Sequence, residues 1–166
     1  MRAAHKVWRL GADIDTDQLA PGAYMKLGLA DIAAHCLEGV RPDFAGAVRP
    51  GDVIAAGPNF GIGSSREQAA GALVQLGVKA IIAPSYSGLY FRNAFNLGLL
   101  LLTCSQAEQL EEGEQISLDL PGRAVARAGG QRLSCDPIPD FLLDMVHAGG
   151  LLPQLKKRLQ RRKETS

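Results

Sequence analysis

The sequence predicts a mixed α/β fold, and two patterns along the chain carry that prediction. First, two buried apolar runs, 52–56 and 78–83, flank a glycine-rich loop and a helix-like segment, which is typical of a parallel strand–helix–strand unit. Second, short strand-like segments around Pro121-Gly122 and Gly129-Gly130 indicate antiparallel hairpins in the second half. Because the chain has 166 residues, 46% of them hydrophobic and 21% charged, we expect one soluble globular domain spanning 1–166.

The same patterns place the individual elements. Alternating or continuous apolar runs predict strands at 6–10, 52–56, 78–83, 99–103, 114–120, 123–127 and 131–135. Helical spacing of apolar residues predicts helices at 29–37, 65–76, 89–96, 107–112, 139–148 and 151–162. Gly39 and Gly77 are expected to end the first two helices, because glycine adopts the left-handed conformation of a helix stop without strain.

The net charge of +1 conceals an uneven distribution. Six basic residues lie near the C-terminus: Lys156, Lys157, Arg158, Arg161, Arg162 and Lys163. The rest of the chain holds twelve basic and sixteen acidic residues. A basic end can bind nucleic acid, but no aromatic residues interleave with it. We therefore expect a solvated final helix, or one that meets an acidic partner, and not a nucleic-acid interface.

Cysteine usage and hydropathy indicate a cytoplasmic protein. The three cysteines, Cys36, Cys104 and Cys135, are odd in number and far apart, which favours reduced thiols over a disulfide framework. No cluster motif is present, so we expect no metal bound by this chain. No apolar run is long enough for a membrane span, and the N-terminal residues lack the core of a secretion signal.

The glycine-rich loop at 57–69 is the candidate functional element. It joins a strand to a predicted helix start, where bare backbone and unpaired N–H groups can bind an anion. Ser64 and Ser65 add hydroxyls, and Arg66 adds a guanidinium suited to a carboxylate or phosphate. P-loop, dinucleotide and nucleophile-elbow motifs are excluded, because no lysine follows Gly63 and Arg66 stands where glycine is needed. A tight turn with a helix cap is the simpler alternative.

Two further polar loops follow predicted strands. The loop at 11–22 holds three carboxylates, but Gln18 and Tyr24 stand where a calcium loop needs glycine and glutamate. The carboxylates of this loop either form turns and helix caps or face a substrate. The turn at 84–88 follows another strand. Because loops at the carboxyl ends of parallel strands meet, we expect the turn at 84–88 to face one crevice with the glycine-rich loop.

These motifs resemble the swivel domains of the aconitase superfamily, and in particular the small subunits of 3-isopropylmalate dehydratase and its homoaconitase-like relatives. The matching stretches are 13–18 with Pro21, 57–69, 84–86, 90–99 and 148–151. The resemblance implies a three-layer β/β/α swivelling domain that forms half of an enzyme. It also implies a separate iron–sulfur large subunit, in a heterodimer or heterotetramer, which carries a [4Fe–4S] cluster.

The resemblance also implies a reaction and roles for single residues. Such enzymes dehydrate and rehydrate a small hydroxy-dicarboxylate, and 2-isopropylmalate and 3-isopropylmalate are interconverted in this way in leucine biosynthesis. By resemblance, Ser64 is the catalytic base that removes a proton from carbon. Ser65 and Arg66 hold a substrate carboxylate, while Asp17 and Thr16 orient groups from the facing loop.

A substrate-specificity loop follows Asp17. In aconitase-like members this region holds an arginine for an extra carboxylate, whereas here it reads Tyr24, Met25, Lys26 and Leu27. Met25 and Leu27 suit an alkyl group, and Lys26 could serve a further carboxylate. Dimethylmalate, another alkylmalate and homocitrate therefore stay open as substrates, as does a non-enzymatic anion- or RNA-binding module. We expect the glycine-rich segment at 22–29 to be mobile in the isolated subunit.

Overall fold

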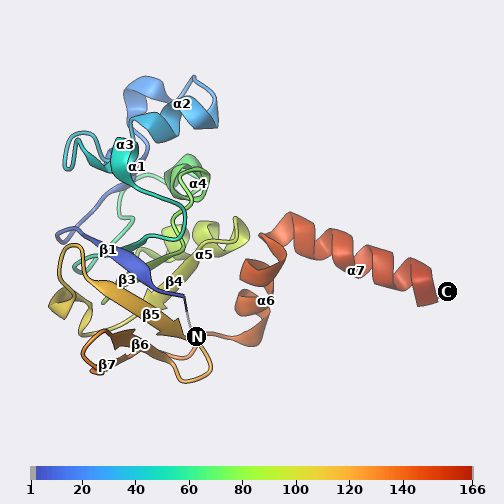
Figure 1. Cartoon of the computed structure of the whole chain (residues 1–166). Helices are drawn as coiled ribbons and strands as arrows, with labels where there is room; N and C mark the ends of the chain where they lie inside the picture. The colour runs from blue at the N-terminus through green and yellow to red at the C-terminus, as the bar shows by residue number, and fades with distance from the viewer. Residues whose placement is uncertain (1–2, 166) are drawn as a thin grey trace.

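The structure is a computed structural model that describes residues 3–165; residues 1, 2 and 166 of the predicted domain lie outside the described range. A single seven-stranded sheet runs through it in the order β4-β3-β2-β1-β5-β6-β7 (Figure 1). The strands are β1 His5–Arg9, β2 Val53–Ala55, β3 Ala80–Ala83, β4 Leu100–Thr103, β5 Gln115–Asp119, β6 Ala124–Arg127 and β7 Arg132–Ser134.

The sheet has a parallel half and an antiparallel half that share β1. Strands β1 to β4 are parallel, and Ile54 of β2 stands opposite Ile81 of β3. On its other side β1 pairs antiparallel with β5, and β5, β6 and β7 continue as antiparallel neighbours. The predicted mixed α/β fold is therefore confirmed, including the parallel unit β2–α4–β3.

Seven α-helices and two short 3₁₀ turns surround this sheet in the described range. The helices are α1 Thr16–Leu19, α2 Leu29–Ala34, α3 Phe44–Ala47, α4 Gln68–Gln75, α5 Gly88–Asn96, α6 Asp140–Ala148 and α7 Leu151–Thr165, and the 3₁₀ turns are Gly22–Tyr24 and Ala107–Gln109. Figure 1 shows α7 projecting from the body of the molecule. No helix in the described range combines the length and the apolarity that crossing a bilayer requires.

Small residues let the helices approach the sheet and each other. The buried face of α4 consists of alanine, glycine and one leucine. A Cβ at Gly71 would lie 3.2 Å from the Leu29 side chain, so α2 packs directly on the α4 backbone. Strands β2 and β3 are buried along their whole length, as their continuous apolar runs predict.

Four element boundaries differ from the sequence prediction. Helix α4 begins at Gln68 rather than at residue 65. Helix α2 ends at Ala34, and the left-handed residue beyond it is Leu37, with φ +61°, rather than Gly39. The segment at 107–112 forms only a 3₁₀ turn. A further helix, α1, replaces part of the expected loop at 11–22 because Asp15 and Gln18 form a reciprocal capping box.

Candidate active site

The loops that follow β1 and β2 are joined by backbone hydrogen bonds. The Gly61 N–H donates to the Ile14 carbonyl at 2.7 Å, and the Thr16 N–H donates to the Ile62 carbonyl at 2.9 Å. Asp15 and Ile62 thereby form a parallel bridge beyond the ends of both strands. The two loops act as a short extension of the parallel sheet, which fixes their side chains relative to each other.

The loop after β3 is joined to the same structure. The Phe60 N–H donates to the Ser85 carbonyl at 3.1 Å, and the Ser87 N–H donates back to the Phe60 carbonyl at 2.9 Å. The Asn59 N–H donates to Ser85 Oγ at 2.9 Å. The expectation that the glycine-rich loop and the turn at 84–88 lie together is therefore confirmed.

Glycine at position 61 is required by the packing of this loop. Gly61 has φ +84°, and a Cβ there would lie 2.2 Å from Cγ of Tyr90. The Tyr90 ring is buried, and its hydroxyl donates to the Ala69 carbonyl at 3.2 Å. The loop backbone therefore lies directly on the Tyr90 ring, whose position is fixed by burial and by the hydrogen bond to Ala69.

Four of the five predicted catalytic and binding residues, all except Asp17, line one shallow hollow. Its lining comprises Thr16, Gly61, Gly63, Ser64, Ser65, Arg66, Ser87, Leu89, Tyr90 and Asn93. Ser64 and Ser65 are exposed, whereas Thr16 is buried. Asn93 on α5 is a further polar member; its position one turn from the polar turn at 84–88 is the signal that could have found it. The hollow is too small to enclose a dicarboxylate, so it forms one wall of a site.

Arg66 and Asp17 form an ion pair beside this hollow. Arg66 Nη1 donates to Asp17 Oδ1 at 2.8 Å and to the Ala20 carbonyl at 3.0 Å. The Gly22 N–H donates to the same Asp17 oxygen at 3.0 Å. The hydrogen bond from Arg66, aided by that from Gly22, lowers the pKa of the Asp17 carboxyl. Asp17 therefore orients the guanidinium and also holds the start of the 22–29 segment.

The helix contributes less to the site than the sequence predicts. Glu67 is the N-cap of α4, so Ser64 and Ser65 lie before the helix rather than in its first turn. Gly63, with φ +103°, and the bonds of Arg66 to Asp17 and Ala20 direct the chain toward the neighbouring loop before the helix begins. The predicted helix start at residue 65, which would place Ser65 in the first helical turn, is therefore wrong.

The specificity loop is held by contacts that sequence reasoning missed. The Tyr24 ring stacks on the His35 ring, with centroids 3.7 Å apart and an interplanar angle of 8°. His35 Nδ1 lies 2.7 Å from Glu38 Oε2. A hydrogen bond to Glu38 raises the pKa of the Tyr24 hydroxyl. The i, i+3 spacing of His35 and Glu38 is the only sequence signal for this cluster.

The other loop residues lie outside the hollow. Met25 is half-buried and packs against the core. Lys26 and Leu27 are exposed, and neither lines the hollow around Ser64. The structure thus brings together Thr16, Ser64, Ser65 and Arg66 in the hollow. Asp17 contacts this group through its ion pair with Arg66, whereas the specificity loop lies outside the hollow.

The cysteines do not assemble a metal site within the described residues, where no group of three His, Cys, Asp or Glu residues could hold an ion. Cys36 is buried, which raises its pKa to about 12. A hydrogen bond from Cys135 lowers the pKa of Cys104 to about 7. This residue set does not fit an iron–sulfur cluster, which needs three or more thiolates at one point.

Comparison with known proteins identifies the family. A family model for the aconitase C-terminal domain matches residues 42–107. A small subunit of 3-isopropylmalate dehydratase from Archaeoglobus fulgidus is 40% identical over 158 residues, covering 94% of this chain and 98% of the relative. A methanogen homoaconitase small subunit from Methanothermobacter thermautotrophicus is 41% identical over 156 residues, covering 93% and 91%.

A solved structure agrees with these sequence relatives. The crystal structure of a 3-isopropylmalate dehydratase protein from Methanocaldococcus jannaschii superposes with a TM-score of 0.92 at 33% identity. The match covers 100% of both chains. The chain therefore belongs to the aconitase-superfamily family of 3-isopropylmalate dehydratase small subunits.

Proposed function

We propose that this chain is the small subunit of a two-subunit hydro-lyase that interconverts 2-isopropylmalate and 3-isopropylmalate by dehydration and rehydration, a step of leucine biosynthesis. The observation that carries the proposal is the gathering of Thr16, Ser64, Ser65 and Arg66 in one hollow. Family membership supplies the reaction class, and the hollow supplies the groups that such a reaction needs on this subunit.

Ser64 is the proposed base. Its hydroxyl, as alkoxide, takes the proton from the carbon next to the one that loses the hydroxyl group. A serine alkoxide needs stabilisation, which the neighbouring Arg66 charge and loop N–H groups provide. Ser64 is exposed in the free subunit. Closure against a second subunit would exclude water and strengthen these interactions.

Arg66 is the proposed carboxylate clamp. Its Nη1 atom donates the bonds to Asp17 and Ala20, and no other hydrogen bond of the guanidinium falls within the described residues. The Nε and Nη2 donors therefore stay available for a bidentate contact with a substrate carboxylate. Asp17 keeps the guanidinium in place while it does so, and Ser65 and Thr16 add hydroxyls nearby.

A large subunit is the proposed partner. The shallow hollow is one wall only, and the described residues of this chain do not gather the ligands of a cluster. A [4Fe–4S] cluster on the large subunit would supply a Lewis acid for the departing hydroxyl. The residues described above would then bind the substrate, orient it and remove its proton.

Homocitrate is the second candidate substrate. The methanogen homoaconitase small subunit is as similar in sequence as the isopropylmalate relatives. Lys26 is exposed on the specificity loop, where it could meet an additional carboxylate. Met25 and Leu27 favour an alkyl substituent instead, which keeps isopropylmalate first and leaves dimethylmalate and other alkylmalates as alternatives.

The test is reconstitution with the iron–sulfur large subunit. Ser64→Ala should lower kcat by at least about 10³-fold with little change in KM, because a proton-transfer group is lost. Ser134→Ala, an exposed serine on β7, is the matched control and should be neutral. Activity of Ser64→Ala within threefold of the wild type would show that another group is the base.

Substrate choice is tested on the same complex. Isopropylmalate, dimethylmalate and homocitrate are compared by kcat/KM, with Lys26→Ala alongside the wild type. Isopropylmalate should give the highest value, and Lys26→Ala should leave it unchanged. A preference for homocitrate that Lys26→Ala abolishes would establish the second candidate instead.

A further inference from the structure

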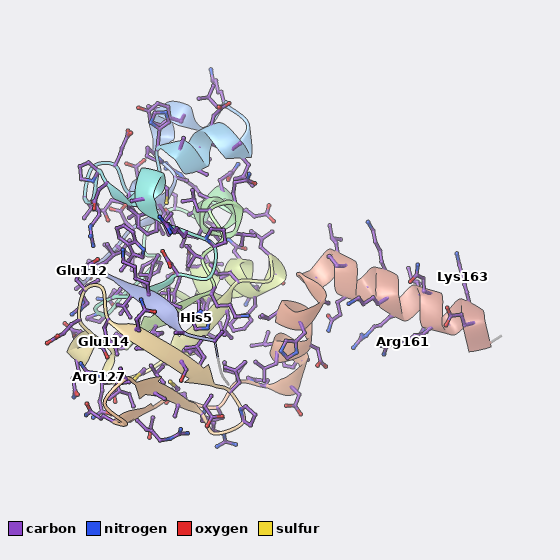
Figure 2. All side chains as sticks on the ribbon, viewed as in Figure 1. His5, Glu112, Glu114, Arg127, Arg161 and Lys163 are labelled. Carbon is purple, nitrogen blue, oxygen red and sulfur yellow. The ribbon has the colours of Figure 1, made fainter. Side chains whose placement is uncertain are left out.

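Helix α7 carries an apolar stripe that the described part of the chain leaves exposed. Leu152, Leu155 and Leu159 are spaced i, i+3 and i+7, so they share one face, and their exposed fractions are 69%, 42% and 57%. The basic residues Lys156, Lys157, Arg158, Arg161, Arg162 and Lys163 accompany the stripe, and Figure 2 shows Arg161 and Lys163 far from the body. An isolated helix of fifteen residues is marginally stable in water, and the principal contacts of α7 are with α6 and α5 near its start, so the exposed leucine face indicates a partner.

A glycine corner fixes the direction in which α7 leaves the body. Gly149 and Gly150 have φ +91° and +123°. A Cβ at Gly150 would lie 2.6 Å from the carbonyl oxygen of Asn96, so the corner is seated on the end of α5. The Gly150 N–H also donates to the Met145 carbonyl at 2.7 Å. Helix α7 therefore points outward and its stripe stays away from its own sheet (Figure 1).

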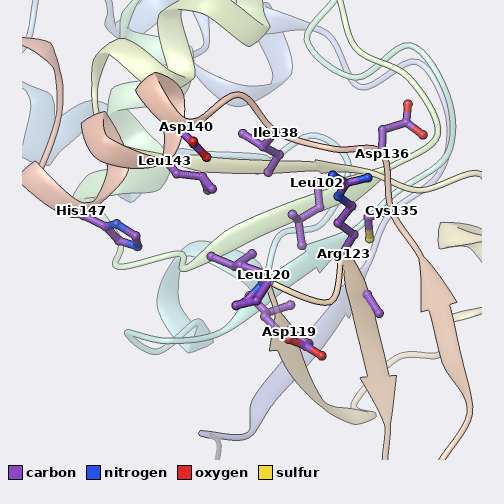
Figure 3. Close-up of a pocket in the computed structure, with 13 residues that line it drawn as sticks. Leu102, Asp119, Leu120, Arg123, Cys135, Asp136, Ile138, Asp140, Leu143 and His147 are labelled. Carbon is purple, nitrogen blue, oxygen red and sulfur yellow. The ribbon is translucent and has the colours of Figure 1, made fainter.

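A cavity of about 650 Å³ lies between α6 and the antiparallel strands (Figure 3). Its apolar lining consists mainly of Leu102, Leu118, Leu120, Ile138 and Leu143. Two exposed carboxylates, Asp136 and Asp140, belong to the same lining, while Asp119 is paired with Arg132. Arg123 and His147 also line it. The apolar lining of this cavity is complementary to the leucine stripe of α7. The carboxylates of the lining are complementary to the basic side chains that accompany the stripe.

We infer that α7 of one copy docks into this cavity of a second copy, and that the exchange is reciprocal in a two-fold dimer. Charge complementarity favours this occupant, because the exposed carboxylates of Asp136 and Asp140 line the cavity and basic side chains accompany the leucine stripe. Direct pairing of two α7 helices would instead bring six basic residues of one copy close to six of the other, and their like charges would repel. In a two-fold dimer the same contact forms twice, so both leucine stripes and both cavities are covered and the assembly closes at two copies. The inference does not rest on the proposed function.

Disulfide trapping tests the contact on the full-length chain. Two variants are made in a Cys135→Ser background, where the two other cysteines are buried. One carries Asp140→Cys at the cavity, and the other, with a different tag, carries Leu155→Cys on α7. Because each chain holds one accessible thiol, a bond between 140 and 155 is intermolecular. We expect the mixed disulfide to form at least about tenfold faster than with Val40→Cys, an exposed control position.

Solution mass provides the second readout. Light scattering should give a dimer for the wild type and a monomer for Leu155→Gln/Leu159→Gln and for Asp136→Lys/Asp140→Lys. Val74→Gln, an equally exposed apolar position on α4, should stay dimeric. Circular dichroism establishes that every variant is folded. Mixing the two monomeric variants should restore a dimer, because one has an intact cavity and the other an intact α7.

Three outcomes would overturn the inference. A wild-type chain that is monomeric at all accessible concentrations has no such contact. A 155–155 disulfide that forms as fast as the 140–155 disulfide would show that α7 pairs with α7. A monomer that changes mass only on addition of RNA or of the large subunit would assign the stripe to that partner.

Discussion

The loops around Ser64 and the helix α7 are held by opposite means. Backbone hydrogen bonds join three loops that are far apart in sequence, as with Phe60 and Ser85. Among the described residues, no buried side-chain nitrogen or oxygen lacks a hydrogen-bond partner. Helix α7 has its own local bonds, and its principal contacts are with α6 and α5. Geometry at the loops therefore depends on many distant residues at once. We therefore expect substitutions in the loops to lower stability or activity strongly, and substitutions on α7 to lower them little.

The largest effect is expected for Gly61→Ala. The new Cβ would lie 2.2 Å from the Tyr90 ring at a φ of +84°, so overpacking and backbone strain add. Unfolding free energy should fall by about 3 kcal/mol, or roughly 6–12 °C in Tm. Gly46→Ala in α3, where a Cβ meets nothing within 4 Å, is the control and should not destabilise. Equal melting temperatures for both variants would contradict the packing argument.

A large effect on activity is expected for Arg66→Lys. Lysine keeps the charge but loses the planar guanidinium that contacts Asp17 and Ala20 and, under the proposed function, also binds a substrate carboxylate. In the reconstituted enzyme, kcat/KM should fall on the order of 10²-fold. Asp17→Asn should cost less, because the guanidinium keeps its Ala20 bond. A larger loss for Asp17→Asn than for Arg66→Lys would reverse these roles.

The same pair has a defined pH dependence. Arg66 lowers the pKa of Asp17 from 3.8, so the ion pair stabilises the fold above that pH. Its contribution is lost as pH falls through the lower, folded-state value. Acid unfolding of Asp17→Asn, followed by circular dichroism, should lack this component. Identical acid transitions in the two proteins would show that the pair is open in solution.

A moderate effect is expected where the specificity loop meets α2. His35→Ala removes the ring on which Tyr24 stacks and the partner of Glu38. Stability should fall by about 1 kcal/mol or less, while hydrogen exchange of amides at 22–29 should speed up. His35→Phe keeps a stacking ring and should retain most protection. In the reconstituted enzyme we expect the ratio of kcat/KM values between substrates to change more than kcat itself.

The smallest effect is expected for truncation before Lys156. This removes the chain from Lys156 onward and leaves Leu151 to Leu155 of α7 in place. At concentrations where the chain is monomeric, Tm should shift by less than about 2 °C. A loss comparable to that of Gly61→Ala would show that α7 supports the body of its own chain.

The sequence predicts most strands and helices because their apolar patterns are local. Strands β2, β3 and β4 have continuous apolar runs, and both terminal helices lie within three residues of the expected bounds. The predicted boundaries of elements are wrong where contacts with residues distant in sequence determine them. Arg66 reaches across to Ala20, which delays α4 by a turn, and no pattern near residue 65 reports that contact.

The sequence predicted which residues of the candidate site lie near one another, but it did not predict the contacts between them. Family motifs nominate Thr16, Ser64, Ser65 and Arg66, and the structure places all four in one hollow. The pairing of Asp17 with Arg66 and the stack of Tyr24 on His35 are tertiary contacts between charged or aromatic groups. Residue types alone allow many such pairs, so only the fold selects among them.

The shallowness of the hollow around Ser64 has a consequence for kinetics under the proposed function. When the base and the Lewis acid sit on separate polypeptides, turnover follows the concentration of the complex rather than that of either chain. Below the dissociation constant, a tenfold dilution of both chains would reduce activity about a hundredfold. Under the proposed function, the free subunit, whose Ser64 is exposed to solvent, has no activity without the large subunit.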